Sequence, residues 1–483
     1  MGFDLLYAVF LGTIVFAIRI VQWYFYLGRR LKGSFLSNVD TWWFLIDAEK
    51  VRDHGFKLSS RLREQSFEAY KYYPPLFFYL LALVPRKFVE PAVKYSPALA
   101  DAFIAAVLSV SVIAATNNLV LAALAVGVYL SSPMIFQQTF CLCIRPLSIL
   151  LISLIFFFSP SFSWLNFAVV VILVVFTLLL HKFAAQIVFF TSLSFLFIGR
   201  FDYLLSVAAG FLISLAISGG YYLKVLRAHL NHLKSSYLRQ VLESQGGSPL
   251  RKIAALGAYC PWLVFFIASI FVLSSNVFSV PFSYLLVWII TLLLLAVLTN
   301  FWKFTVIGEG YRYLGYMIFP LAFWVAYTFE YSPNLLWVYV IFIVVSIVTS
   351  YYYVLRLFSM HRPYLISEAD IEIFKQISSI DGHTIAALPK EFTYALSYFS
   401  GKDYMMRLEL DFEERAAKIA DIVVLNKECA TASMYEEVTK RGYSVKFEKG
   451  KWTVFTRSLP VGSTAHLENS RANRWQENLD KPN

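Results

Sequence analysis

Long apolar segments recur along this chain and constrain its fold more than any other feature. Many are about 18–22 residues long, the length that an α-helix needs to cross the ~30 Å hydrocarbon core of a bilayer. Hydrophobic residues make up 58% of the chain, and the mean hydropathy is +0.61, which excludes an ordinary soluble globular protein. A transmembrane β-barrel would show short alternating segments instead. We therefore predict a polytopic α-helical membrane protein.

Eleven apolar segments are expected to be transmembrane helices. They lie near residues 5–27, 96–115, 118–135, 141–158, 164–180, 183–199, 203–223, 257–275, 280–299, 313–329 and 335–357. The run PPLFFYLLALVP (residues 74–85) is too short to span and predicts an interfacial helix. Residues 224–256 place Leu and Val at helical spacing beside Lys, Arg and His, which predicts an amphipathic helix on the membrane surface.

The sequence predicts two domains followed by a tail. Residues 1–357 would form the transmembrane domain, with residues 29–95 as its first large loop. Residues 358–460 change to short helical and strand-like segments, such as HTIAALP and DIVVLNKE, which predicts a small soluble α/β domain. Residues 461–483 are polar, a composition typical of a disordered tail.

Alternation of the spans places most polar segments on one side of the membrane. If each span crosses once, that side holds residues 29–95, His181–Lys182, residues 224–256, residues 300–312 and the α/β domain. The formal net charge is +11, and its basic excess lies in the loops of the transmembrane domain. Such loops suit phosphates or anionic lipid headgroups better than nucleic acid. The number of Lys and Arg would by itself place this side in the cytoplasm.

The first large loop contains the segment VDTWWFLIDAEKVRDHG, which carries an acidic residue at helical spacing. Asp40, Phe44, Ala48 and Arg52 recur every four residues, so they form a slowly turning stripe on one helix. Asp40 would lie in the first turn. It is a candidate general base, and the alternative is a partner for the helix dipole or for a loop Arg. Two further acidic residues, Asp47 and Glu49, are expected on other faces, solvated or paired.

Three cations stand at the predicted ends of spans on the same side. Arg145 begins a span, where it either faces a polar cavity or extends to the interface. His181 and Lys182 separate two apolar runs, and Lys182 is either a phosphate ligand or part of a plain turn among headgroups. Arg312 precedes a late span and can bind phosphate through two N–H groups.

Three neighbouring side chains complete the candidate set. Glu309 can orient Arg312 through an ion pair, and Tyr313 follows that arginine directly. Tyr73 belongs to the Tyr-rich segment YKYYPP, for which the alternative interpretation is an interfacial aromatic belt.

One reaction suits a carboxylate and several cations on one membrane face. The chain has no P-loop, HExxH or CxxC motif and no Ser-His-Asp spacing. In transfer of a sugar from a lipid phosphate, cations stabilise the departing phosphate and a carboxylate takes the proton of the acceptor. An amphiphilic donor would also explain a site at the bilayer surface.

At these residues the chain resembles the GT-C superfamily of integral-membrane glycosyltransferases, and most of all its protein O-mannosyltransferase and aminoarabinose-transferase branch. The pattern D-x3-aromatic-x3-A-x3-R-x2-G of that branch is matched from Asp40 to Gly55. Its PPL segment is matched by residues 74–76, and an Arg-Tyr pair before a late span by Arg312 and Tyr313. A small α/β tail is also common there.

The resemblance implies donors that are polyprenyl-phosphate-linked sugars and an inverting transfer with Asp40 as base. It implies that Arg145, Lys182 and Arg312 contact the lipid phosphate or the sugar. Asp40 is followed by Thr41 and not by the Glu that protein mannosyltransferases usually carry, and the WWDYG signature of oligosaccharyltransferases is absent. Because no paired-carboxylate metal motif is present, we expect no metal and no other cofactor.

Several questions stay open from the sequence. The acceptor can be a lipid, a glycan or a protein, and the sugar is not defined. A transporter or flippase of lipid-linked sugars is the alternative function, although such proteins usually show internal repeats, which are lacking here. A non-catalytic scaffold subunit would not require Asp40. The resemblance implies a multi-pass protein of the plasma or inner membrane, with its active site and α/β domain on the non-cytoplasmic face, against the Lys and Arg count.

Overall fold

A computed structural model of the chain describes most of its residues and divides them into two compact units. The described residues are 2–24, 35–36, 39–56, 72–138, 144–234, 248–272, 280–301, 307, 310–361, 365–389, 392–404 and 420–457. The first unit is Met1–Glu368 and the second is Ala369–Asn483. Glu309 and the predicted tail, residues 461–483, lie outside the described residues.

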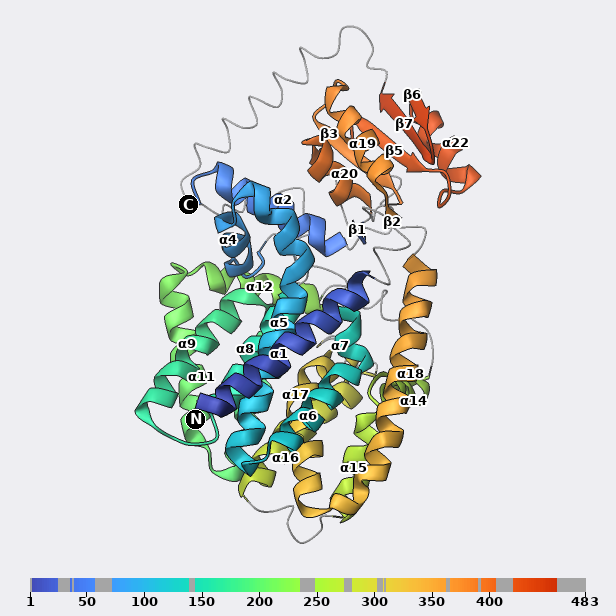
Figure 1. Cartoon of the computed structure of the whole chain (residues 1–483). Helices are drawn as coiled ribbons and strands as arrows, with labels where there is room; N and C mark the ends of the chain where they lie inside the picture. The colour runs from blue at the N-terminus through green and yellow to red at the C-terminus, as the bar shows by residue number, and fades with distance from the viewer. Residues whose placement is uncertain are drawn as a thin grey trace. The chain divides into compact units, whose positions relative to one another are not determined.

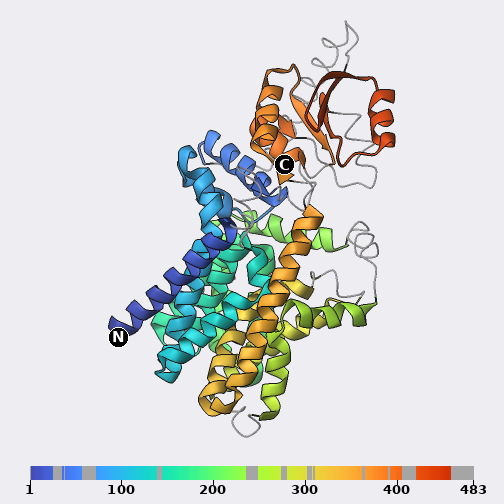
Figure 2. The same ribbon diagram turned by 45° about the vertical axis from the view of Figure 1, so that its right-hand side comes forward.

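The first unit is a bundle of apolar helices (Figures 1 and 2). Its helices are α1 (Gly2–Trp23), α5 (Arg86–Thr116), α6 (Leu119–Ser131), α7 (Pro133–Gln138), α8 (Ile144–Phe158), α9 (Trp164–Leu180), α10 (Lys182–Ser194), η3 (Phe195–Ile198), α11 (Phe201–Ile217), α15 (Trp262–Val272), α16 (Val280–Leu298), α17 (Gly310–Tyr331), η5 (Pro333–Leu335) and α18 (Leu336–His361). Each of the eleven predicted segments contains one of these helices.

The number of membrane crossings is less clear than the number of helices. Within the described residues, three helices are long and apolar enough to cross alone, namely Phe3–Gln22, Tyr95–Thr116 and Pro333–Tyr353. Two bent helix pairs raise this to five, and five further apolar helices have only 10–17 residues. Because about 20 residues are needed to span the hydrocarbon core, the predicted count of eleven crossings is not confirmed.

Helix α17 forms the centre of this bundle. All but one of its residues from Tyr313 to Phe329 are buried, and it packs against α5, α6, α8, α15 and α16. The indole N–H of Trp324 donates to Ser269 Oγ at 2.8 Å, which satisfies a polar group in an apolar environment. Because α17 is enclosed in this way, the residues of its first turn are held in a fixed position.

Short helices gather at one end of the bundle, where Figures 1 and 2 show α2, α4 and α12 together. They are α2 (Val39–Asp53), α4 (Leu76–Leu83) and α12 (Tyr221–Lys234), with α14 (Pro249–Tyr259) before α15. Helix α12 is bent by 110° from α11, and α14 by 94° from α15. The interfacial helix predicted for residues 74–85 is thus α4, and the amphipathic segment predicted for residues 224–256 contains α12 and α14.

The side chain of Arg52 joins helix α2 to the carboxyl end of α4. Arg52 donates from Nε to Ala82 O (3.1 Å) and from Nη2 to Leu81 O (3.3 Å) and Val84 O (2.6 Å). These carbonyls lie at the carboxyl end of α4, where intrahelical donors run out. Arg52 also pairs with Glu49, so the last member of the Asp40 stripe has a structural role.

The second unit is a small α/β fold. Its sheet has the order β4 (Asp403–Tyr404), β3 (Thr384–Leu388), β5 (Ile422–Asn426), β7 (Trp452–Arg457) and β6 (Tyr443–Lys449). The first three strands are parallel and the last two antiparallel. The other elements are α19 (Glu368–Gln376), η7 (Ile377–Ser379), α20 (Thr393–Ser400) and α22 (Ala432–Lys440). Short continuous apolar runs, which form the buried strands β3 and β5, and the αL glycine at the end of α20, Gly401, made these elements predictable.

The units separate between Glu368 and Ala369, whereas the sequence analysis placed the boundary after residue 357. The difference arises because α18 continues to His361 and is followed by β2 (Leu365–Ile366). That strand pairs antiparallel with β1 (Phe35–Leu36), which precedes α2. Both strands belong to the first unit.

Arg19, a cation near the carboxyl end of α1, is fully buried in an ion pair between helices. Its Nε lies 2.8 Å from Asp101 Oδ2 of α5, and Tyr129 of α6 donates to the other carboxylate oxygen at 2.8 Å. Arg19 Nη1 also donates to Gln22 Oε1. A charge in an apolar bundle is tolerated only when it is paired in this way, so the network fastens α1 to α5 and α6.

Substitution of Asp101 by Ala should destabilise the protein by about 3–5 kcal/mol, because it leaves Arg19 charged and buried. Tyr129→Phe removes one hydrogen bond and should cost less, about 1.5–3 kcal/mol. Thermal unfolding in detergent would measure the order of the two effects. The double variant Arg19→Met with Asp101→Leu should recover much of the lost stability, and an Asp101→Ala protein as stable as wild type would contradict the role of the pair.

Candidate active site

The predicted cations lie at three helix ends that the fold brings together. Arg145 is the second residue of α8, Lys182 begins α10, and Arg312 is in the first turn of α17. Tyr316, one turn after Arg312, connects the three ends. Its hydroxyl lies 2.6 Å from Ser148 Oγ of α8 and 3.1 Å from Nδ1 of His181, the residue between α9 and α10.

Aromatic packing reinforces this junction. The ring of Phe183, next to Lys182, lies 4.6 Å from the ring of Tyr313 and 5.8 Å from that of Tyr316, measured between centroids. Tyr313 is fully buried, and its hydroxyl donates to Ile307 O at 3.3 Å. Tyr313 therefore supports the first turn of α17, and the described contacts show no role for it beyond packing and this hydrogen bond.

The electrostatics of His181 show how close the cations are. Burial of the imidazole, followed by the positive charges of Arg145, Arg312 and Lys182, lowers the pKa of His181 well below its ordinary value. His181 lies in the turn between two apolar helices, and its ring is neutral at neutral pH. The neutral ring of His181 thus lies among three cations. The sequence analysis predicted that these cations lie on one side of the membrane, and their chemical roles stay predictions.

Tyr73 connects this group to α2. Its ring lies under the Lys182 ammonium, 4.9 Å from Nζ to the centroid, a cation–π contact. On its other side the ring meets Trp43 at 5.3 Å and Phe44 at 6.4 Å. The Tyr221 hydroxyl of α12 donates to Tyr73 O at 3.4 Å. Tyr73 is therefore a positioned contact between α2 and the cations and not only an interfacial aromatic residue.

Asp40 lies in the first turn of α2, one turn before Phe44. Its backbone is described and its side chain is not, so its distance to the cations stays a prediction. What the structure establishes is that the helix carrying Asp40 packs, through its second turn, on the tyrosine that covers Lys182.

The expectation that Asp47 lies on another face of α2 than Asp40 is wrong. Seven residues advance an α-helix by nearly two full turns, so Asp47 lies roughly 20° from Asp40 around the axis and not on another face. Its side chain is only 1% exposed, so it is not solvated. Glu49, in contrast, pairs with Arg52 and Arg86 as expected.

Ser148, Phe183 and Tyr316 were missed by the sequence analysis. Helical spacing offers a signal for two of them, because Ser148 follows Arg145 by three residues and Tyr316 follows Arg312 by four, which places each one turn along from a cation. Within the described residues no group of three His, Cys, Asp or Glu side chains is arranged to hold a metal. Asp40 and Glu309 side chains are not among those residues, so metal independence stays a prediction.

A cavity lies beside Tyr72, the neighbour of Tyr73 in the sequence. It measures about 890 Å³ and is lined mainly by α12, with Leu223, Lys224, Arg227 and Leu230 among its residues. The Tyr72 ring also contacts the Tyr221 ring at 6.2 Å. An amphiphilic molecule would find both apolar and basic side chains there.

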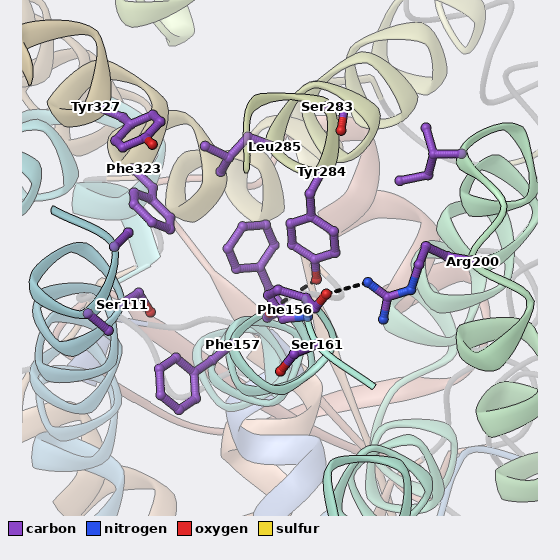
Figure 3. Close-up of a pocket in the computed structure, with 14 residues that line it drawn as sticks. Ser111, Phe156, Phe157, Ser161, Arg200, Ser283, Tyr284, Leu285, Phe323 and Tyr327 are labelled. Carbon is purple, nitrogen blue, oxygen red and sulfur yellow. Dashed lines mark hydrogen bonds between the residues drawn. The ribbon is translucent and has the colours of Figure 1, made fainter. Parts of the chain in front are cut away.

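A second cavity lies at the other end of α8, away from the cations. It measures about 540 Å³, and Figure 3 shows aromatic side chains around it. Phe156 follows Arg145 by eleven residues, which is roughly 17 Å along the helix. Arg200 at its rim pairs with Asp202 at 2.7 Å and donates to the backbone of Ser159 and Pro160. None of the predicted site residues lines it.

The fold and the site together define a class: a polytopic membrane protein in which cationic helix ends meet beneath short helices at one end of the bundle. No protein-family model and no curated protein sequence matches the chain. Among solved structures, it is similar to ArnT from Cupriavidus metallidurans bound to undecaprenyl phosphate, with a TM-score of 0.59, 11% identity, and coverage of 92% of this chain and 97% of ArnT. The apo state of ArnT gives a TM-score of 0.56 and 12% identity with the same coverage.

The chain therefore has the fold of ArnT, an aminoarabinose transferase of the GT-C superfamily, over nearly its whole length. The predicted GT-C resemblance is confirmed at the level of the fold, which is as far as 11–12% identity extends.

The low pKa of His181 should appear in the pH dependence of stability. The unfolded chain binds a proton at His181 near pH 6.5 and the folded chain does not, so acid favours unfolding below that pH. His181→Asn should remove this contribution. Thermal unfolding at pH 7.5, 6.5 and 5.5 should therefore show a steeper loss of stability for wild type, and parallel curves for the two proteins would contradict the lowered pKa.

Proposed function

We propose that this protein is a glycosyltransferase that takes a sugar from a polyprenyl-phosphate donor. The observation that carries the proposal is the convergence of Arg145, Lys182 and Arg312 around one neutral imidazole, in a fold shared with ArnT. A group of three cations in a partly enclosed site favours binding of an anionic ligand. The similar ArnT structure is bound to undecaprenyl phosphate, a ligand with a phosphate and a long apolar chain.

In the proposed reaction the cations hold the phosphate while its bond to the sugar breaks. Negative charge grows on the leaving phosphate, so cations placed there stabilise the transition state more than the ground state. Arg312 and Arg145 can each offer two N–H groups to phosphate oxygens, and Lys182, fixed over Tyr73, offers a point charge. The phosphate leaves without needing a proton.

Asp40 is the proposed general base. A carboxylate in the first turn of α2 takes the proton of the acceptor hydroxyl as that oxygen attacks the sugar carbon from the side opposite the phosphate. Attack from that side inverts the configuration. Packing of Trp43 and Phe44 on Tyr73 holds this helix at the cation group. Glu309 is proposed to orient Arg312, and no metal takes part.

The sugar and the acceptor are proposed only as classes: a hexose or pentose, and a lipid, glycan or protein hydroxyl. The basic and apolar cavity beside Tyr72 favours an amphiphilic acceptor. Nothing in the fold favours the transporter alternative, because its structural relatives are transferases.

The Asp40→Asn variant separates an enzyme from a scaffold subunit. Loss of the base should lower turnover by about 10²–10⁴-fold, while binding of undecaprenyl phosphate stays intact. Asp53→Asn is a matched control, because Asp53 is an exposed carboxylate at the other end of the same helix. Sugar transfer by Asp40→Asn at a near-normal rate, in a well-folded preparation, would refute the assignment.

We further propose that the cation group faces the non-cytoplasmic side of the plasma or inner membrane. Leu230 of α12 is 55% exposed and lines the cavity beside Tyr72, so a cysteine there reports the side of that helix. The test uses a Cys429→Ser background, because Cys429 is partly exposed whereas Cys260 is buried. In that background, a membrane-impermeant maleimide added to intact cells should label the chain with Leu230→Cys above the level of the chain without it. Labelling only after permeabilisation would reverse the orientation.

A further inference from the structure

One assignment of protons satisfies all the hydrogen bonds described between Arg145, Ser148, Tyr316 and His181. Ser148 Oγ lies 2.8 Å from the backbone oxygen of Arg145 and 2.6 Å from the Tyr316 hydroxyl. A carbonyl oxygen only accepts, so the one proton of Ser148 points to Arg145 O. The contact between Ser148 and Tyr316 then requires the tyrosine proton.

The same reasoning determines which nitrogen of His181 carries its proton. Since Tyr316 has given its proton to Ser148, its 3.1 Å contact with His181 is a hydrogen bond only if Nδ1–H donates. The imidazole is neutral because burial and three nearby cations lower its pKa, so it has one proton. That proton is on Nδ1, and Nε2 is therefore an unprotonated acceptor.

An acceptor nitrogen in this place cannot bind phosphate. Phosphate oxygens are themselves acceptors at neutral pH, and two lone pairs repel each other. A hydroxyl group, in contrast, donates to Nε2 readily. The sugar of the donor is covalently attached to the phosphate that the cations would hold, so its hydroxyls are the nearest such groups.

We propose that His181 recognises a hydroxyl group of the donor sugar through Nε2 and does not bind the lipid phosphate. This inference rests on the proposed function and narrows the substrate, because the sugar must carry a free hydroxyl near its phosphate. Ser148 and Tyr316 act as positioning residues, since they hold the imidazole in the tautomer that accepts.

Two substitutions at His181 separate this role from others. In His181→Asn the amide N–H can replace Nδ1–H toward Tyr316, but the acceptor at the Nε2 position is lost. In His181→Gln the amide oxygen can reach the Nε2 position, but the bond to Tyr316 is lost. If the role of His181 is purely structural, His181→Asn should preserve it. If His181 recognises a hydroxyl group, His181→Gln should preserve that recognition.

Binding is measured in detergent with two kinds of ligand. One is undecaprenyl phosphate alone, and the other is the tightest wild-type ligand among undecaprenyl-phosphate glucose, mannose, arabinose and aminoarabinose. We expect His181→Asn to bind undecaprenyl phosphate like wild type and the sugar form roughly 3- to 10-fold more weakly. His181→Gln should retain most of the affinity for the sugar form. Arg312→Gln, as a control, should weaken both ligands.

Other results would overturn the proposal. Weaker binding of undecaprenyl phosphate alone to both His181 variants would make His181 a phosphate ligand. Normal binding of the sugar form by His181→Asn, together with its loss in His181→Gln, would make its role structural. If wild type binds neither ligand, the proposed function fails and the role of His181 fails with it.

The tautomer itself can be measured without any ligand. A ¹⁵N spectrum of histidine-labelled protein, compared with that of His181→Asn, assigns the two ring nitrogens of His181. We expect a neutral ring with the proton on Nδ1. A proton on Nε2, or a doubly protonated ring, would refute the acceptor role even if the transferase function holds.

Discussion

Hydrocarbon cannot solvate charge, and the arrangement of this protein depends on that constraint. The described cations of the site lie where helices begin, at Arg145, Lys182 and Arg312, so that the apolar length of each helix stays free of charge. Arg19 is the exception within a helix, and it is paired with Asp101 and fully enclosed. Concentrating charge at the ends of helices is what produces a group of cations at one end of the bundle.

Three like charges around one point repel each other, and the structure limits that cost without a described carboxylate at the junction. His181 stays neutral, Tyr73 places the negative face of its ring under Lys182, and Tyr316 ties the three helix ends together through neutral hydrogen bonds. An anion bound at this point would lower the remaining repulsion.

Sequence reasoning succeeded where a local pattern determines structure. Each of the eleven predicted apolar segments overlaps a described helix of the bundle, and short apolar runs bounded by turn residues predicted the central strands β3 and β5 of the second unit. Alternation of the spans also predicted that Arg145, Lys182 and Arg312 would share one side. It did not predict the bends between α11 and α12 or between α14 and α15, because a bend in an apolar segment depends on what packs beside it.

The site was harder to predict at the level of single contacts. Ser148 and Tyr316 are separated by 168 residues, and their hydrogen bond depends on how α8 packs against α17. Asp47 was placed on the wrong face of α2, although its spacing from Asp40 contained the correct answer. Its burial depends on tertiary packing, which the local sequence does not report.

The clasp made by Arg52 has a consequence for how the protein responds to its surroundings. Its guanidinium holds the last carbonyls of α4, and the rings of Trp43 and Phe44 pack on those of Phe77 and Phe78, so α2 and α4 are joined at several points. Leu80 and Leu83 of α4 present apolar side chains outward, where acyl chains would touch them. The lipid around α4 is therefore only one helix away from the helix that carries Asp40.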